Sequence, residues 1–283
     1  MANHGFKPTL VMGARGNVGK HVLNDLIARG LPVRASARHP EPGQFPADVD
    51  VRAADLTDPA TLGPAFDGVG QVFLYAHREG VRGVMDAARR AGVGRIVVMS
   101  SGSVIHPTSE GNTLTEQHRE IEDMFAAADD LMVIPIRPLV LAANALGWAH
   151  PIRATGTVAL YRPEALTAPI HERDIAAVAV AALTGNNDTT DMLTGPTRMS
   201  QRGQVAVIAA ATGKDITVGV LTGEDALKQF SGFMPVEEAH AVVRFLDDAA
   251  MGNSPATDAV ERILGRPAVS FDRWAADHAA DFL

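Results

Sequence analysis

The chain has 283 residues, of which 46% are hydrophobic and 20% charged, a balance typical of a globular protein with a large buried core. Its formal net charge of −8 and the lack of any basic block argue against a nucleic acid or an anionic membrane as partner. No cysteine is present, which excludes disulfides and thiolate chemistry, and no N-terminal apolar stretch has the length of a signal peptide or a membrane span. We therefore expect a cytoplasmic protein with one main domain and an appended lobe.

Strand-like and helix-like segments alternate along the first half of the chain. A short apolar strand at 10–12 precedes a helix at about 18–30, in which apolar residues recur at helical spacing. Further strands are expected at 32–38, 49–56, 70–76, 95–101 and 131–138, and further helices at 81–93, 115–128 and 171–185. Strands that alternate with helices predict an α/β fold, a Rossmann-type doubly wound parallel sheet with helices on both faces.

The second half of the chain has weaker periodicity. Residues 142–170 contain three prolines, so we expect a loop-rich stretch there, followed by helices near 203–212 and 223–230. The tail from about 254 to 283 could cover a pocket, dock on the main body or form a contact in a homo-oligomer. Its apolar residues are Val260, Ile263, Leu264, Phe271 and Trp274.

Three glycines lie between the first strand and the first helix, in VMGARGNVGK. Gly13 permits a tight turn, Gly16 lets a phosphate approach the backbone, and Gly19 lets the helix pack close to the strand. The helix N-terminus then offers N–H groups and a positive dipole to a pyrophosphate. Because the triplet follows a strand and opens a helix, we expect a dinucleotide site rather than a merely structural turn. We assign to the cofactor Gly13, Ala14, Arg15, Gly16, Asn17, Val18 and Gly19.

The end of the second strand indicates which dinucleotide binds. Its sequence, VRASARHP, lacks the carboxylate that would bind a ribose 2′-hydroxyl. Arg38 could pair with a 2′-phosphate, and Arg15 could close on that phosphate from the other side. These two residues favour NADP(H) over NAD(H), although each could also be a solvated surface arginine.

These features suggest a division into two parts. Residues 1–141 form the expected NADP(H)-binding domain, to which about 172–195 returns. Residues 142–283 form mainly the smaller substrate-binding lobe.

Several spaced motifs accompany the glycine turn, namely AADLTDPATL, AGVGRIVVMSSGS, HREIEDMF, IRPLVLAAN and LTGPTRMS. With them, from about residue 8 to its end, the chain resembles the NmrA-like branch of the atypical short-chain dehydrogenases/reductases. The resemblance implies a Rossmann domain that binds NADP(H), with Asp55 and Leu56 against the adenine and Tyr75 and Ala76 following the cofactor. Many such proteins reduce quinones, enones or related small electrophiles, and others sense the nucleotide without known catalysis.

One departure from this group concerns catalysis. Better-known relatives carry a Tyr and a Lys four residues apart on the helix after the fifth strand, with the Tyr as proton donor. Counted from Glu122, these positions hold Leu114 and His118 here. A ketone needs a proton on its developing alkoxide, whereas a quinone delocalises the charge, so the sequence favours a conjugated acceptor. His118 could orient the nicotinamide ribose or donate a proton, or it could only brace the helix against Glu122.

Other polar residues complete the candidate site. Ser100 and Ser101 end the fifth strand, where ligand crevices form, so we expect Ser100 at the cofactor and Ser101 with His118 at the reaction. Both serines could instead bond neighbouring backbone in the turn. Glu172 and Asp174 fit the capping of a helix start better than catalysis. The candidate substrate contacts are His77, Asn144, Trp148 and Tyr161, of which the last two could equally be packing residues.

The remaining histidines lack metal-ligand spacing, so no metal site is expected. The leading hypothesis is an NADPH-dependent reductase of a small conjugated acceptor. One alternative is a regulatory protein that senses NADP(H) without turnover. Another is a non-redox enzyme of secondary metabolism on the same fold.

Overall fold

The computed structural model describes residues 7–283, which divide into two compact units. Unit 1 combines the chain up to Gly102 with Gln117–Arg137 and Ile175–Asp191. Unit 2 combines Ser103–Glu116, Pro138–Asp174 and Met192–Leu283. Among the described residues, no helix has both the length and the apolar character needed to cross a membrane.

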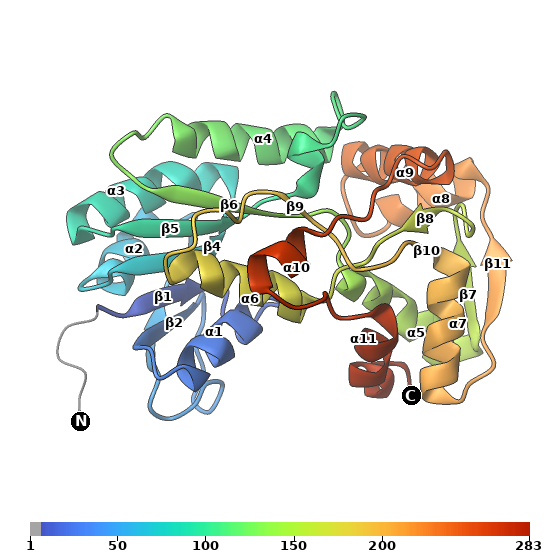
Figure 1. Ribbon diagram of the computed structural model, residues 1–283, viewed down its shortest axis with the longest axis horizontal. Coiled ribbons are helices and arrows are strands. Elements are labelled where there is room, and N and C mark those ends of the chain that lie inside the picture. The colour runs from blue at the N-terminus through green and yellow to red at the C-terminus, as the bar shows by residue number, and fades with distance from the viewer. Residues whose placement is uncertain (1–6) are drawn as a thin grey trace. The chain divides into compact units, whose positions relative to one another are not determined.

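The main sheet has seven strands in the order β3-β2-β1-β4-β5-β6-β9 (Figure 1). Their bounds are β1 Thr9–Met12, β2 Val33–Ala37, β3 Asp50–Ala53, β4 Gln71–Tyr75, β5 Arg95–Met99, β6 Val133–Pro138 and β9 Met192–Leu193. The pairs from β3 through to β6 are all parallel. The strand order reverses between β1 and β4, and at such a switch point the crevice for a ligand opens beyond the carboxyl ends of the strands. This topology confirms the predicted Rossmann-type α/β fold.

Helices cover both faces of this sheet. They are α1 Gly19–Ala28, α2 Pro59–Phe66, α3 Val81–Ala91, α4 Thr113–Ala126 and α6 Glu172–Leu183, with short 3₁₀ turns at Arg78–Gly80 and Gly102–Ile105. Figure 1 shows α3 and α4 on one side of the strands and α1 and α6 on the other. Alternate strand residues such as Leu10 and Met12 are buried in one cluster with Phe66 of α2, Val84 of α3 and Phe125 of α4. The parallel pairing of β1 with β4 places the carboxyl ends of these two strands next to each other.

Helix α2 was not among the elements expected from the sequence. This helix has only eight residues and contains Pro64, so its periodic signal is weak. Asp58 marks its start, because the side chain accepts a hydrogen bond from Ala60 N.

Unit 2 contains most of the elements in the second half of the chain. Its helices are α5 Ala149–Thr155, α7 Gln201–Thr212, α8 Gly223–Ser231, α9 Val236–Ala250, α10 Ala259–Leu264 and α11 Phe271–Asp277, with 3₁₀ helices η3 Ala142–Trp148 and η4 Ala279–Phe282. Two small sheets pair β7 Thr157–Leu160 with β11 Thr217–Val220, in parallel, and β8 Leu166–Thr167 with β10 Met199–Ser200, antiparallel.

The prediction of a loop-rich stretch at 142–170 was wrong. This stretch contains η3, α5, β7 and β8. Pro151 misled the interpretation, because it occupies the first turn of α5, where its missing N–H costs no helical hydrogen bond. Helix α9 also went unpredicted, although its apolar residues follow helical spacing.

The C-terminal tail docks on unit 2. Phe271, Trp274 and Phe282 are buried in one apolar cluster with Val205 and Ile208 of α7. The contacts within unit 2 therefore make the tail part of the core of that unit.

Candidate cofactor site

The glycine turn between β1 and α1 has the geometry that its sequence indicated. Gly13 has a φ of +73°, in the left-handed region, and its carbonyl oxygen accepts a hydrogen bond from Gly16 N at 2.9 Å. A Cβ added to Gly19 would lie 2.2 Å from that same carbonyl oxygen. The start of α1 therefore approaches the turn more closely than any other residue type would allow.

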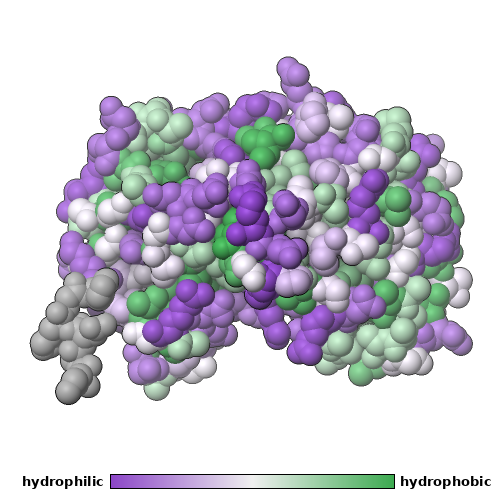
Figure 2. Space-filling view, viewed as in Figure 1, coloured by the Kyte–Doolittle hydropathy of each residue, from purple (hydrophilic) through white to green (hydrophobic). Residues whose placement is uncertain are grey.

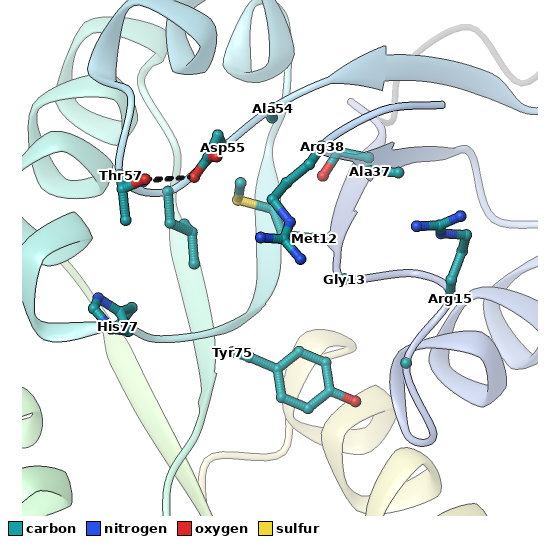
Figure 3. A pocket seen from close by; sticks show the side chains of 13 residues that line it. Met12, Gly13, Arg15, Ala37, Arg38, Ala54, Asp55, Thr57, Tyr75 and His77 are labelled. Carbon is teal, nitrogen blue, oxygen red and sulfur yellow. Dashed lines mark hydrogen bonds between the residues drawn. The ribbon is translucent and has the colours of Figure 1, made fainter. Parts of the chain in front are cut away.

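A cleft of about 490 Å³ opens beside this turn, at the carboxyl ends of β1, β2 and β4 (Figure 3). Its walls are formed by Met12, Gly13, Arg15, Gly16, Ser36, Ala37, Arg38, Ala54, Asp55, Leu56, Thr57, Tyr75 and His77. The cleft thus brings together candidate residues from four separate segments of unit 1. His77, which we expected at the substrate, lies in this wall with the cofactor candidates.

Two arginines reach the cleft without a carboxylate partner among the described residues. Arg15 and Arg38 are both exposed and line the cleft on the two sides of Gly13 (Figure 3). Arg34, by contrast, has a structural role, because its Nε donates to Asp50 at 2.7 Å and one terminal nitrogen donates to the carbonyl oxygen of Asp67 at 2.6 Å. Two guanidinium groups are therefore available to an anion in the cleft.

Asp55 is held in the opposite wall by its own loop. Its carboxylate accepts hydrogen bonds from the backbone N–H and the hydroxyl of Thr57, at 2.9 and 2.8 Å. These bonds, with a smaller contribution from the charge of Arg38, lower the pKa of Asp55. The carboxylate is thus ionised at neutral pH, and its position is set by local bonds.

Tyr75, the last residue of β4, lies directly over the glycine turn. Its hydroxyl oxygen accepts hydrogen bonds from Val18 N at 3.0 Å and Gly19 N at 2.9 Å. Burial raises the pKa of the phenol, and the two backbone bonds partly oppose that shift. The sequence placed Tyr75 near the cofactor but gave no sign that its hydroxyl would bind the helix N-terminus.

The other turn candidates differ in exposure. Ala14, Val18 and Gly19 are buried, whereas Asn17 is exposed. The buried side chains of Ala14 and Val18 thus pack inside the turn.

The end of β5 carries a buried polar network. Ser100 donates to Glu122 Oε1 at 2.5 Å, and Arg137 Nε donates to the same oxygen at 2.9 Å. A terminal nitrogen of Arg137 also binds Glu122 Oε2, and the two side chains are only 17% and 12% exposed. Sequence reasoning missed Arg137, although a charged residue inside the apolar strand VIPIRP was a usable signal.

The Glu122 carboxylate, which was one possible hydrogen-bond partner for His118, is bonded to Ser100 and Arg137 instead. Among the described contacts His118 has no hydrogen bond to Glu122. Burial lowers the pKa of His118, and the charge of Glu122 opposes this only in part. His118 is therefore a neutral imidazole at neutral pH. Ala76, Ser100, Ser101 and His118 do not line the cleft at the glycine turn, and neither do Ala14, Asn17, Val18 and Gly19 of the turn itself.

The three remaining candidates belong to unit 2. Asn144 is exposed in η3, and Trp148 packs against the cluster around Trp274. Tyr161 lies in another cluster, where its hydroxyl donates to Asp247 Oδ1 at 2.8 Å. The structure therefore places Trp148 and Tyr161 in different clusters.

The parallel sheet, the glycine turn and the adjoining cleft define a dinucleotide-binding Rossmann protein. Residues 13–186 match the family described as NAD(P)H-binding, and the chain belongs to this family. The match confirms the nicotinamide cofactor and the resemblance to NmrA-like atypical short-chain dehydrogenases/reductases.

Two curated relatives match almost the whole chain. One is the (4-alkanoyl-5-oxo-2,5-dihydrofuran-3-yl)methyl phosphate reductase of Streptomyces griseus, 32% identical over 280 residues, which cover 96% of this chain and 98% of the relative. The other is the NAD(P)H azoreductase of Xenophilus azovorans, 31% identical over 287 residues, with the same shares covered. The chain is thus an NAD(P)H-dependent oxidoreductase, as predicted.

Solved structures share the fold over nearly the full length. The NADPH complex of a quinone oxidoreductase from Escherichia coli aligns with a TM-score of 0.78 and 22% identity, covering 95% of this chain and 99% of the other. The NADP(H) complex of a triphenylmethane reductase from Citrobacter sp. aligns with a TM-score of 0.76 and 18% identity, covering 96% and 99%.

Proposed function

We propose that the protein is an NADPH-dependent reductase that transfers hydride to a small conjugated acceptor, a quinone or an enone, without a Tyr-Lys pair. The observation that carries this proposal is the residue set on α4, where the positions of that pair hold Leu114 and His118. Leucine cannot donate a proton, and the burial of His118 keeps its imidazole neutral. An acceptor that spreads the developing charge over a conjugated system fits such a site better than a simple ketone does.

The proposed roles of the cofactor residues follow from the cleft. When bound, NADPH supplies a hydride from its nicotinamide ring. The backbone N–H groups at the start of α1 bind the pyrophosphate, and Asp55 and Leu56 lie against the adenine. Arg15 and Arg38 bind the 2′-phosphate, since both reach the cleft and neither is paired with a described carboxylate.

The catalytic roles remain those proposed from the sequence. Ser100 is held at the end of β5 by Glu122 and positions the nicotinamide end of the cofactor. Ser101 and His118 act at the reacting atoms, with neutral His118 as a hydrogen-bond donor to the acceptor oxygen or to the nicotinamide ribose. His77 in unit 1 and Asn144 in unit 2 remain the proposed substrate contacts, each exposed in its own unit. Trp148 and Tyr161 pack in apolar clusters of unit 2, the other role that the sequence left open for both.

The test measures NADPH oxidation with a panel of quinones, enones and simple ketones, beside binding titrations of NADPH and NADH. We expect turnover of the conjugated acceptors and not of the ketones. Arg38→Gln should weaken NADPH binding roughly tenfold, because a charge-assisted phosphate contact is lost, and leave NADH binding unchanged. Arg90→Gln, an exposed arginine on α3 away from the cleft, is the matched control.

Two results would contradict the proposal. Equal affinity for NADPH and NADH in the unaltered protein would refute the role of the arginines. Tight NADPH binding with no turnover across the panel would favour a sensor of NADP(H) or a non-redox enzyme.

A further inference from the structure

The N-terminus of α1 obtains its hydrogen-bond acceptor from an unusual source. The first N–H groups of any helix lack partners within the helix, and the N-cap residue, Val18, has no side chain that could accept from them. The phenol oxygen of Tyr75 accepts from both Val18 N and Gly19 N, at 3.0 and 2.9 Å. These are the distances that a bound oxygen of an anion would also have to such donors.

The ring of Tyr75 also fills the space that the glycines leave open. A Cβ added to Gly13 would lie 2.8 Å from the ring carbon Cδ2, and one added to Gly16 would lie 3.2 Å from the hydroxyl oxygen. The absence of side chains at Gly13 and Gly16 is what allows a phosphate to approach this turn. In this structure the tyrosine ring occupies that approach.

A pyrophosphate and the phenol would therefore compete for the same two N–H groups and the same space. We propose that Tyr75 closes the pyrophosphate part of the cofactor site in the unliganded protein, and that its side chain has to swing away before NADP(H) binds. This inference rests on the proposed binding of NADP(H) at the glycine turn, and it adds a gate to that site.

The surroundings of Tyr75 allow this movement. The residue ends β4, is only partly buried and forms one wall of the 490 Å³ cleft. Its aromatic neighbour is Phe73, in an edge-to-face contact at 5.6 Å between ring centroids. The movement that we expect is a rotation about the side-chain bonds that takes the hydroxyl away from Val18 N and Gly19 N.

With a gate of this kind, the observed affinity is the affinity of the open state multiplied by the fraction of molecules that are open. Tyr75→Phe keeps the ring but removes the oxygen that bonds to Val18 N and Gly19 N, so the closed state loses its hydrogen bonds. We expect this variant to bind NADP⁺ about three to ten times more tightly than the unaltered protein does. Thr212→Val, which removes a hydroxyl bonded to the backbone of α7 in unit 2, should not change the affinity.

A second ligand separates the gate from a general effect on the site. Adenosine 2′-monophosphate carries the adenosine and the 2′-phosphate but has nothing to place at the glycine turn. Its affinity should be the same in the unaltered protein and in Tyr75→Phe. Selective tightening for NADP⁺ supports the gate, whereas unchanged or weaker NADP⁺ binding by the variant refutes it. If the unaltered protein does not bind NADP⁺ at all, the proposed function fails as well.

Ring signals provide an independent measurement. In the Tyr161→Phe protein, Tyr75 is the single remaining tyrosine, so ¹³C-labelled tyrosine reports on it alone. NADP⁺ should shift its ring resonances, and adenosine 2′-monophosphate should leave them near their unliganded positions. A ring that does not respond to saturating NADP⁺ would refute the movement.

Discussion

Replacement of Trp274 by phenylalanine should destabilise unit 2 through one buried hydrogen bond. Trp274 Nε1 donates to Glu172 Oε2 at 3.0 Å, and both side chains are almost completely buried. The other carboxylate oxygen of Glu172 lies 2.6 Å from His278 Nε2. Although burial alone would raise the pKa of Glu172, hydrogen bonds from His171 and His278 lower it well below its usual range, so the carboxylate is charged at neutral pH.

The size of the effect follows from these contacts. A hydrogen bond to a charged group contributes about 1.5–3 kcal/mol, and the smaller ring leaves a void that adds roughly 1 kcal/mol. Trp274→Phe should thus reduce the free energy of unfolding by about 2–4 kcal/mol. In a Glu172→Gln background the same substitution should cost less, since the bond is then made to a neutral acceptor.

Urea unfolding followed by circular dichroism measures both values. Trp148→Phe is the matched control, because Trp148 is half-buried at the same cluster and makes no hydrogen bond among the described residues. Equal losses of stability for Trp274→Phe and Trp148→Phe would refute the reasoning. The reasoning would also be refuted if Trp274→Phe reduced the free energy of unfolding by the same amount in the unaltered protein and in the Glu172→Gln background.

Two further predictions concern the polar groups of unit 1. Arg137→Met should cost about 3–5 kcal/mol of unfolding free energy, because it leaves the buried carboxylate of Glu122 without its cationic partner. Urea titration measures this loss, and the double variant Arg137→Met/Glu122→Gln should recover part of it; no recovery would contradict the ion-pair explanation. The lowered pKa of His118 means that the unfolded chain takes up a proton before the folded one as the pH falls through about 6.5, so stability should fall with it. Melting temperatures between pH 7.5 and 5.5 should therefore drop more steeply for the unaltered protein than for His118→Asn, and parallel curves would show that His118 does not contribute.

The sequence predicted the parts of the protein whose signals are local. The strand, the glycine turn and the helix of residues 9–28 follow one another within one stretch, and their spacing alone indicated a dinucleotide site. Helix α9 has a comparable pattern of apolar residues at helical spacing, and this local signal was sufficient to predict it. Its omission was an error of interpretation rather than a lack of signal.

The residues that went unrecognised depend on contacts between distant segments. Glu172 and Asp174 read as acidic caps of α6, yet Glu172 binds Trp274, and Asp174 binds the backbone N–H of Val269 at 2.6 Å. The hydrogen bonds of Tyr75 could not be predicted for the same reason, because the backbone N–H groups that bind its hydroxyl lie more than fifty residues earlier in the chain. Neither the order nor the spacing of residues around these positions contains that information.

The alternation of the chain between the two units has a consequence for its synthesis. Six successive segments belong to units 1 and 2 in turn, and unit 1 receives its last segment only with Ile175–Asp191. Before residues 175–191 are made, the sheet therefore lacks α6, which lies with α1 on one side of the strands (Figure 1). Unit 2 waits still longer, because Trp274 and Phe282 complete its core at the very end of the chain. Unit 1 thus cannot finish folding before two segments of unit 2 have been made, and unit 2 completes its core after unit 1 has all its residues.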